Sequence, residues 1–164
     1  PKSFALLQEN IEWNRLETVL AVQAALVPSN SKGKSLTLYT DAEGTWLSSS
    51  SIQEGAWNGG QDDMEAITVP TITLAEALEK AGQQVDVVKM DIEGAEWDIL
   101  MGATSELTKM NRLILEYHPR RTRHLPDLIE HLEKYGLLLA TPLSQSPKKN
   151  MELQILEFFQ RHQK

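Results

Sequence analysis

The alternation of short apolar runs and amphipathic segments after residue 73 is the feature that most constrains the fold of this chain. Residues 85–90 and 113–117 are apolar runs of strand length, and a helical pattern follows each of them. Strands that alternate with helices are typical of a parallel sheet covered by helices. The pattern therefore predicts an α/β fold, in which ligands bind beyond the carboxyl ends of the strands.

Local start and stop signals predict where helices begin and end. Thr73 is a candidate cap, and Glu76 three residues later completes a capping box. Pro126 suits the first turn of a later helix, which Gly136 is placed to end. Helices are expected over residues 2–14, 74–82, from about 95, and 126–135.

Further strands are expected on both sides of this central pattern. They are predicted at residues 18–27, around 36–38, at 137–140 and at 153–159. Residues 41–66 are rich in Ser, Gly, Asp and Glu, which predicts a long loop or a loose hairpin. No repeat or domain boundary stands out, so a single domain over residues 1–164 is predicted.

Composition narrows the class of protein. The chain is 41% hydrophobic and 24% charged, without cysteine and without an apolar run of membrane-spanning length. We therefore expect a soluble, cytoplasmic globular protein with no membrane partner. The formal net charge of -7 argues against a nucleic-acid partner. One basic cluster, made by Arg120, Arg121 and Arg123, is interpreted as a solvated loop.

Polar residues gather where two of the predicted strands end. Lys89, Asp91 and Glu93 share one face if the first strand continues to residue 93. Glu116 and His118 share a face at the end of the second strand. If the two strands are parallel neighbours, their carboxyl ends meet, and we expect the acidic residues and the histidine to converge.

Two chemical uses fit such a group. A carboxylate paired with a histidine is a suitable general base for a hydroxyl, because imidazole titrates near neutral pH. Oxygen and nitrogen ligands also suit a divalent cation, but ion pairing within the pocket is the simpler explanation, so no metal is predicted. Glu96, near the start of the next helix, is interpreted as an anion stabilised by the helix dipole.

The stretch from Val85 to Glu96, followed by Leu100 and Gly102-Ala103, resembles the hallmark of FkbM-type methyltransferases. In that hallmark an apolar strand ends in Lys-x-Asp-x-Glu-Gly-x-Glu, and Leu and Gly-Ala follow. The resemblance covers nearly the whole chain, because further segments are similar in the same order. These segments are residues 4–14, 25–26, 69–74 and 113–119. A departure occurs at Ala75, where the family usually has Asp.

The resemblance implies a class I methyltransferase fold, with a Rossmann-like, mostly parallel sheet and helices on both faces. It also implies an S-adenosylmethionine-dependent transfer of a methyl group to a hydroxyl of a small molecule, such as a sugar or a polyketide. We expect Asp91, Glu93, Glu116 and His118 on the acceptor side of the site, with Lys89 tuning Asp91.

The cofactor side of the site is expected to be incomplete. The family's first two strands and its glycine-rich loop have no counterpart in this sequence, which starts at Pro1. Ala25 is the one residue expected to contact the cofactor, with its backbone packed beside the adenine. In the class I sheet the missing strands lie between the third and fourth strands. We therefore expect either a gapped sheet or a part of a longer protein.

Two further expectations follow from this gap. Unpaired strand edges favour self-association of the chain. The gap also leaves two alternatives to an active enzyme: a truncated, non-catalytic remnant, or an α/β module that binds a small molecule or a protein through its acidic pocket.

Overall fold

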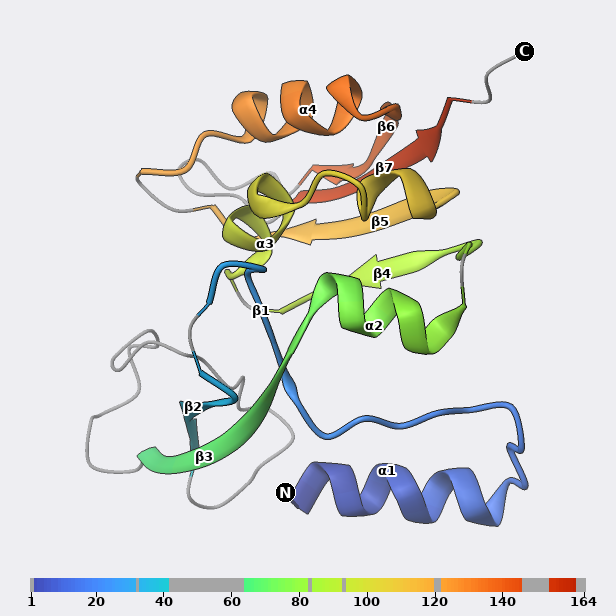
Figure 1. Cartoon of the computed structure of the whole chain (residues 1–164), viewed down its shortest axis with the longest axis vertical. Coiled ribbons are helices and arrows are strands. Elements are labelled where there is room, and N and C mark those ends of the chain that lie inside the picture. Colours follow the sequence, from blue (N-terminus) through green and yellow to red (C-terminus); the bar gives the residue numbers. More distant parts are fainter. Residues whose placement is uncertain are drawn as a thin grey trace. The chain divides into compact units, whose positions relative to one another are not determined.

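The computed structural model describes residues 2–31, 33–41, 64–82, 84–92, 94–119, 122–145 and 154–161. The chain divides into two compact units (Figure 1). The first unit holds Pro1–Ala25 and Gly33–Thr71, and the second holds Leu26–Lys32 and Ile72–Lys164. The expected single domain over residues 1–164 stays a prediction.

The first unit contains α1 (Lys2–Trp13), β2 (Ser35–Asp41) and all but the last two residues of β3 (Met64–Thr73), which pairs antiparallel with β2. Helix α1 and strand β2 confirm predictions made from the sequence. Strand β3 was not predicted, because it follows a polar stretch and contains Pro70, a residue that argues against a strand. The predicted loop therefore ends by Met64, and residues 42–63 lie outside the described residues.

The predicted strand at residues 18–27 is mostly wrong. Only β1 (Ala25–Val27) forms, within a three-stranded sheet of order β1-β3-β2. The preceding residues include the exposed side chains of Val19, Leu20 and Val22. An apolar, β-prone run becomes a strand only where a partner offers backbone hydrogen bonds, and among the described residues this segment has none.

The second unit contains a four-stranded sheet of order β4-β5-β7-β6. Its strands are β4 (Val88–Met90), β5 (Arg112–Tyr117), β6 (Leu137–Gln145) and β7 (Gln154–Gln160). Strands β4 and β5 are parallel, whereas β7 runs antiparallel to both β5 and β6. The expected mostly parallel sheet is thus corrected to a mixed one, because β7 pairs antiparallel with both of its neighbours.

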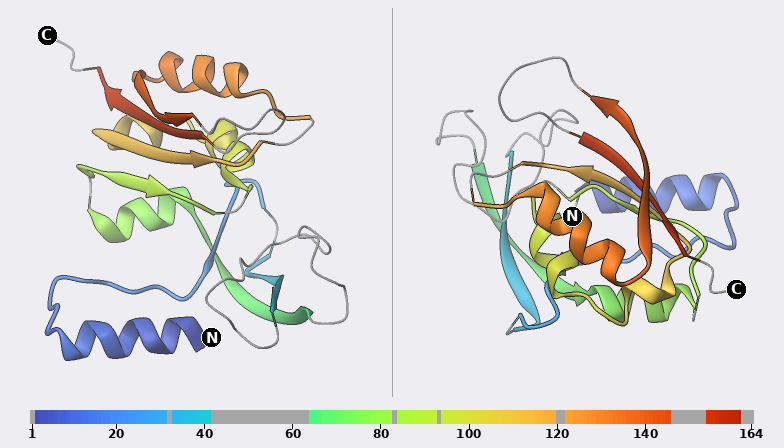
Figure 2. Two further views of the ribbon diagram at one scale, coloured as in Figure 1. Left: turned by 180° about the vertical axis from the view of Figure 1, so that it is seen from behind. Right: turned by 90° about the horizontal axis from the view of Figure 1, so that it is seen from above.

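Three helices accompany this sheet: α2 (Leu74–Ala81), α3 (Glu96–Gly102) and α4 (Leu125–Lys134) (Figure 2). The predicted capping box of α2 is confirmed. The Thr73 amide donates to Glu76 Oε2 at 2.8 Å, and the Glu76 amide donates to Thr73 Oγ1 at 3.3 Å. No helix in the described part of the chain is long and apolar enough to cross a membrane.

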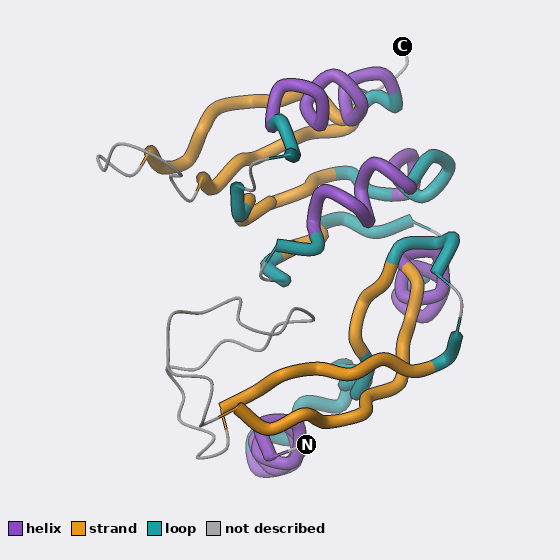
Figure 3. Tube along the Cα trace, turned by 90° about the vertical axis from the view of Figure 1, so that its left-hand side faces the viewer, coloured by secondary structure: helices purple, strands orange, loops and turns teal. Residues whose placement is uncertain are grey.

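The core of the second unit lies between these helices and one face of the sheet (Figure 3). Alternate residues of β5, Leu113, Leu115 and Tyr117, are buried in it. On the opposite face, Phe159 of β7 is 43% exposed. Within the described part of this unit, α2, α3 and α4 all contribute to the same core, and the expectation of helices on both faces stays a prediction. Right-handed crossovers that progress in one direction, from β4 to β5 to β6, place their helices on the same face.

Candidate functional site

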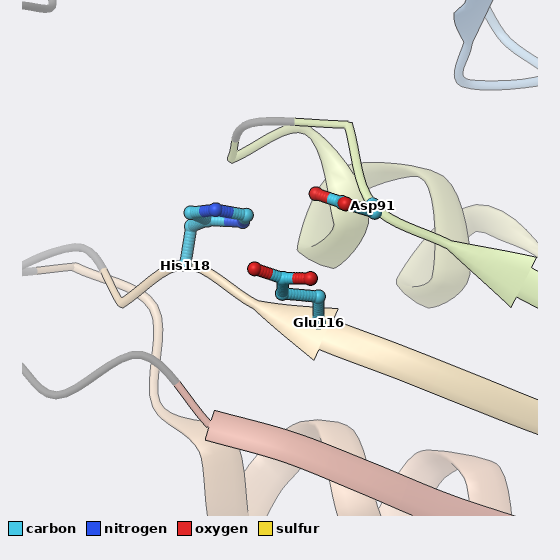
Figure 4. A group of neighbouring side chains, drawn as sticks. All are labelled: Asp91, Glu116 and His118. Atoms are coloured by element: carbon cyan, nitrogen blue, oxygen red, sulfur yellow. The ribbon is translucent and has the colours of Figure 1, made fainter. Parts of the chain in front are cut away.

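The carboxyl ends of β4 and β5 bring three of the predicted site residues together. These strands are parallel, with Met90 opposite Leu115, so Asp91, just after β4, lies level with Glu116 near the end of β5. A carboxylate oxygen of Asp91, a carboxylate oxygen of Glu116 and a ring nitrogen of His118 lie within 4.8 Å of one another (Figure 4). The convergence expected at these strand ends is therefore present in the structure.

Lys89 supplies positive charge to the two carboxyl groups. Its Nζ lies 2.8 Å from Asp91 Oδ2 and 3.9 Å from Glu116 Oε2. The hydrogen bond from Lys89 lowers the pKa of Asp91 below its ordinary value. Burial, together with the neighbouring Asp91 carboxylate, raises the pKa of Glu116. Asp91 is therefore the more readily ionised of the pair, and Glu116 holds its proton to higher pH.

Glu96 is a buried carboxylate at the first residue of α3, and it reaches back to the turn after β4. Its side chain is 1% exposed, and its Oε1 accepts hydrogen bonds from the amides of Ile92 at 3.1 Å and Gly94 at 2.9 Å. The same oxygen lies 3.0 Å from His118 Nδ1. Burial alone would raise the pKa of Glu96, but the hydrogen bonds with His118 and Gly94 outweigh it and lower the pKa.

The sequence analysis interpreted Glu96 as an anion stabilised by the helix dipole. It did not predict the hydrogen bonds of Glu96 with the turn amides and with His118. A local signal was present, since Gly94 has φ 99°, a conformation that glycine adopts readily and that allows a tight turn. A carboxylate two residues after such a glycine can reach back to the amides of the turn. The contact with His118, 22 residues further along the chain, has no sequence signal of its own.

Arg123, in the loop after β5, contacts the turn between β4 and α3. Its guanidinium donates to the Gly94 carbonyl at 2.7 Å and forms an ion pair with Asp98 of α3. The Arg123 side chain is 18% exposed, so its assignment to a solvated loop is wrong. Arg120 and Arg121 lie outside the described residues.

Two expected site residues are not joined to this cluster. Glu93 lies outside the described residues. Ala25 begins β1 and belongs to the first compact unit, whereas Asp91, Glu116 and His118 belong to the second. The role of Ala25 beside an adenine stays a prediction.

The chemistry of the donors favours a base and hydrogen-bond acceptors over a metal centre. Two carboxyl groups and an imidazole at this spacing can share a cation, but Lys89 already neutralises part of their charge. Exposed acidic groups are common without an ion. The prediction of no metal stays a prediction.

The described residues of this site do not form a binding loop for S-adenosylmethionine, the cofactor that the resemblance implies. Such cofactors are usually held by free backbone amides in a glycine-rich loop that follows a strand. Here, after β4, the amides of Ile92 and Gly94 are occupied by Glu96. The described residues around this turn therefore do not fit the cofactor.

Comparison with known proteins gives one result that bears on this site. A family model described as the methyltransferase FkbM domain matches residues 4–139, a range that includes every site residue discussed above. The comparisons with curated proteins and with solved structures found no match.

Proposed function

The chain belongs to the FkbM methyltransferase domain family, and from this premise we propose that it is an S-adenosylmethionine-dependent O-methyltransferase. Family membership indicates methyl transfer in general. The proposed acceptor is a hydroxyl of a small molecule such as a sugar or a polyketide. Both the cofactor and the acceptor class come from the family resemblance.

The observation that carries the acceptor proposal is the convergence of Asp91, Glu116 and His118 at the ends of two parallel strands. A hydroxyl is a weak nucleophile, and a positioned base makes it a better one. His118 can accept the hydroxyl proton, because imidazole titrates near neutral pH. Asp91 and Glu116 can accept hydrogen bonds from neighbouring hydroxyls and so orient the acceptor.

S-adenosylmethionine, when bound, supplies an electrophilic methyl group. The residues of this chain act on the other reactant: Asp91 and Glu116 hold the acceptor, Lys89 keeps Asp91 charged, and His118 takes a proton. Replacing His118 by Ala is expected to lower turnover about 100-fold to 10,000-fold, the usual contribution of a general base.

The test follows transfer of labelled methyl from S-adenosylmethionine to a panel of sugars and polyketide-like alcohols. His124→Ala is the matched control, because His124 is an exposed histidine that precedes α4. Turnover that is equal in the His118→Ala variant and the unmodified chain would remove His118 from the mechanism.

A binding module without catalysis is the second candidate. The spacing of Asp91, Glu116 and His118 favours it, because such a cluster can bind a cation or a polar ligand without chemistry. Calorimetry separates the candidates. Heat of binding with S-adenosylmethionine supports the transferase, whereas saturable binding of Mg²⁺ with no response to the cofactor supports the binding module or a non-catalytic remnant.

A further inference from the structure

We infer that Glu96 is a positioning residue that holds His118 with its proton on Nδ1, so that Nε2 is the nitrogen that accepts the proton of the substrate hydroxyl. This inference rests on the proposed function. It extends that function to a residue outside the group of Asp91, Glu116 and His118, which we call the acceptor cluster. It assigns the tautomer of the base and the residue that fixes it.

The tautomer follows from the chemistry of the contact between Glu96 and His118. The pKa of Glu96 is lowered, so its side chain is a carboxylate at neutral pH, and a carboxylate has no proton to donate. The hydrogen in the 3.0 Å contact must therefore belong to His118 Nδ1. A neutral imidazole carries one N–H, which makes Nε2 the acceptor.

The backbone of the turn fixes where Glu96 lies. The oxygen that meets His118 also accepts the amides of Ile92 and Gly94, so it cannot move without leaving two donors unpaired. Its side chain is 1% exposed, which leaves it little access to compensating water. Arg123 holds the same turn through the Gly94 carbonyl. The imidazole is thereby oriented before any substrate binds.

Glu96 also stabilises the product of proton transfer. When His118 accepts a proton it becomes a cation beside a buried carboxylate, and this contact favours the charged form. The other described charged groups around it are Asp91 and Glu116, which act in the same direction, and Lys89, which is paired with Asp91. Of the three carboxyl groups, Glu96 is the one in an observed hydrogen bond with the ring.

The decisive experiment is a pH titration of the full chain labelled with ¹⁵N in histidine, followed by long-range ¹H–¹⁵N spectra. The His118 signals are assigned by their loss in His118→Asn. The expected spectrum of neutral His118 shows a protonated Nδ1 and an unprotonated Nε2. In Glu96→Gln, which keeps an oxygen for the two amides but loses the charge, the midpoint of the His118 titration is expected to fall by about one pH unit.

Glu106→Gln is the matched control. Glu106 Oε2 accepts a hydrogen bond from the amide of Thr104, two residues earlier, at 3.0 Å, just as Glu96 accepts one from the amide of Gly94. The observed contacts of Glu106 in the described chain do not include a histidine. This variant tests the loss of a turn-capping carboxylate alone. We expect it to leave the His118 midpoint unchanged.

Glu96→Asp, which restores the charge on a shorter side chain, is expected to return the His118 midpoint towards that of the unmodified chain. A proton on Nε2 of neutral His118, or an unchanged midpoint in Glu96→Gln, would overturn the inference. These readouts require no substrate. A chain that gives the expected spectra but transfers no methyl group would support the Glu96–His118 pairing and refute the proposed function.

Discussion

The two carboxyl groups at the ends of β4 and β5 differ in their electrostatic surroundings. Asp91 receives a hydrogen bond from Lys89, which lowers its pKa, whereas burial and the Asp91 charge raise the pKa of Glu116. Neighbouring carboxyl groups whose pKa values are pushed apart can take different roles at one pH. Asp91 therefore stays ionised to lower pH than Glu116, so it is the more constant hydrogen-bond acceptor of the two.

Replacing Lys89 by Met is expected to raise the pKa of Asp91, because the hydrogen bond that lowers it is lost. Since the folded-state pKa of Asp91 lies below its ordinary value, its contribution to stability is present at neutral pH and is lost as pH falls through that pKa. Both side chains are partly exposed, so we expect the variant to lose at most about 1 kcal/mol at pH 7.

Urea denaturation at pH 7, and again in acid below the pKa of Asp91, measures this difference. The stability gap between the Lys89→Met variant and the unmodified chain should close in acid. Lys34→Met is the control, because Lys34 is exposed and makes no observed ion pair within the described residues. A gap of the same size at both pH values would show that Lys89 does not act through Asp91.

At the scale of helices and strands, features that depend on neighbouring residues in the sequence were predictable. Features that depend on pairing with strands distant in the sequence were not. The Thr73–Glu76 capping box and the alternation of β5 are encoded within a few residues, and both appear as expected. The predicted strand at residues 85–90 shortens to β4, because Val85 makes only an isolated bridge to Met110. The antiparallel placement of β7 between β5 and β6 depends on pairing across the sheet, which periodicity does not report.

Replacing Thr73 by Ala tests the capping box of α2. The change removes the acceptor of the Glu76 amide, and we expect a loss of about 1 kcal/mol in the free energy of unfolding. Denaturant unfolding followed by circular dichroism measures it. Thr122→Ala, at an exposed threonine in a turn, is the control. Equal stability of the two variants would mean that the cap contributes nothing.

At the scale of the whole molecule, the core and the acceptor cluster both belong to the second compact unit. The cluster was predictable on the condition that the two strands are parallel neighbours, and the structure meets this condition: Asp91 follows β4, and Glu116 lies near the end of β5. The role proposed for Glu96 was not predictable, because it depends on a tertiary contact with His118. Local patterns thus located the candidate cluster, whereas the contact between Glu96 and His118 emerged only from the folded chain.

The edges of the four-stranded sheet bear on how copies of the chain behave together. Among the described residues β4 pairs only with β5, so its other edge is open, and Val87 next to it is 49% exposed. Open edges with apolar side chains favour pairing between copies, and a lysine there opposes it. We expect concentration-dependent association in sedimentation equilibrium, reduced by Val87→Lys. Val22→Lys, at a valine that is 44% exposed outside any strand, is the control. Equal effects of the two lysines would point to general charge repulsion instead of pairing at the β4 edge.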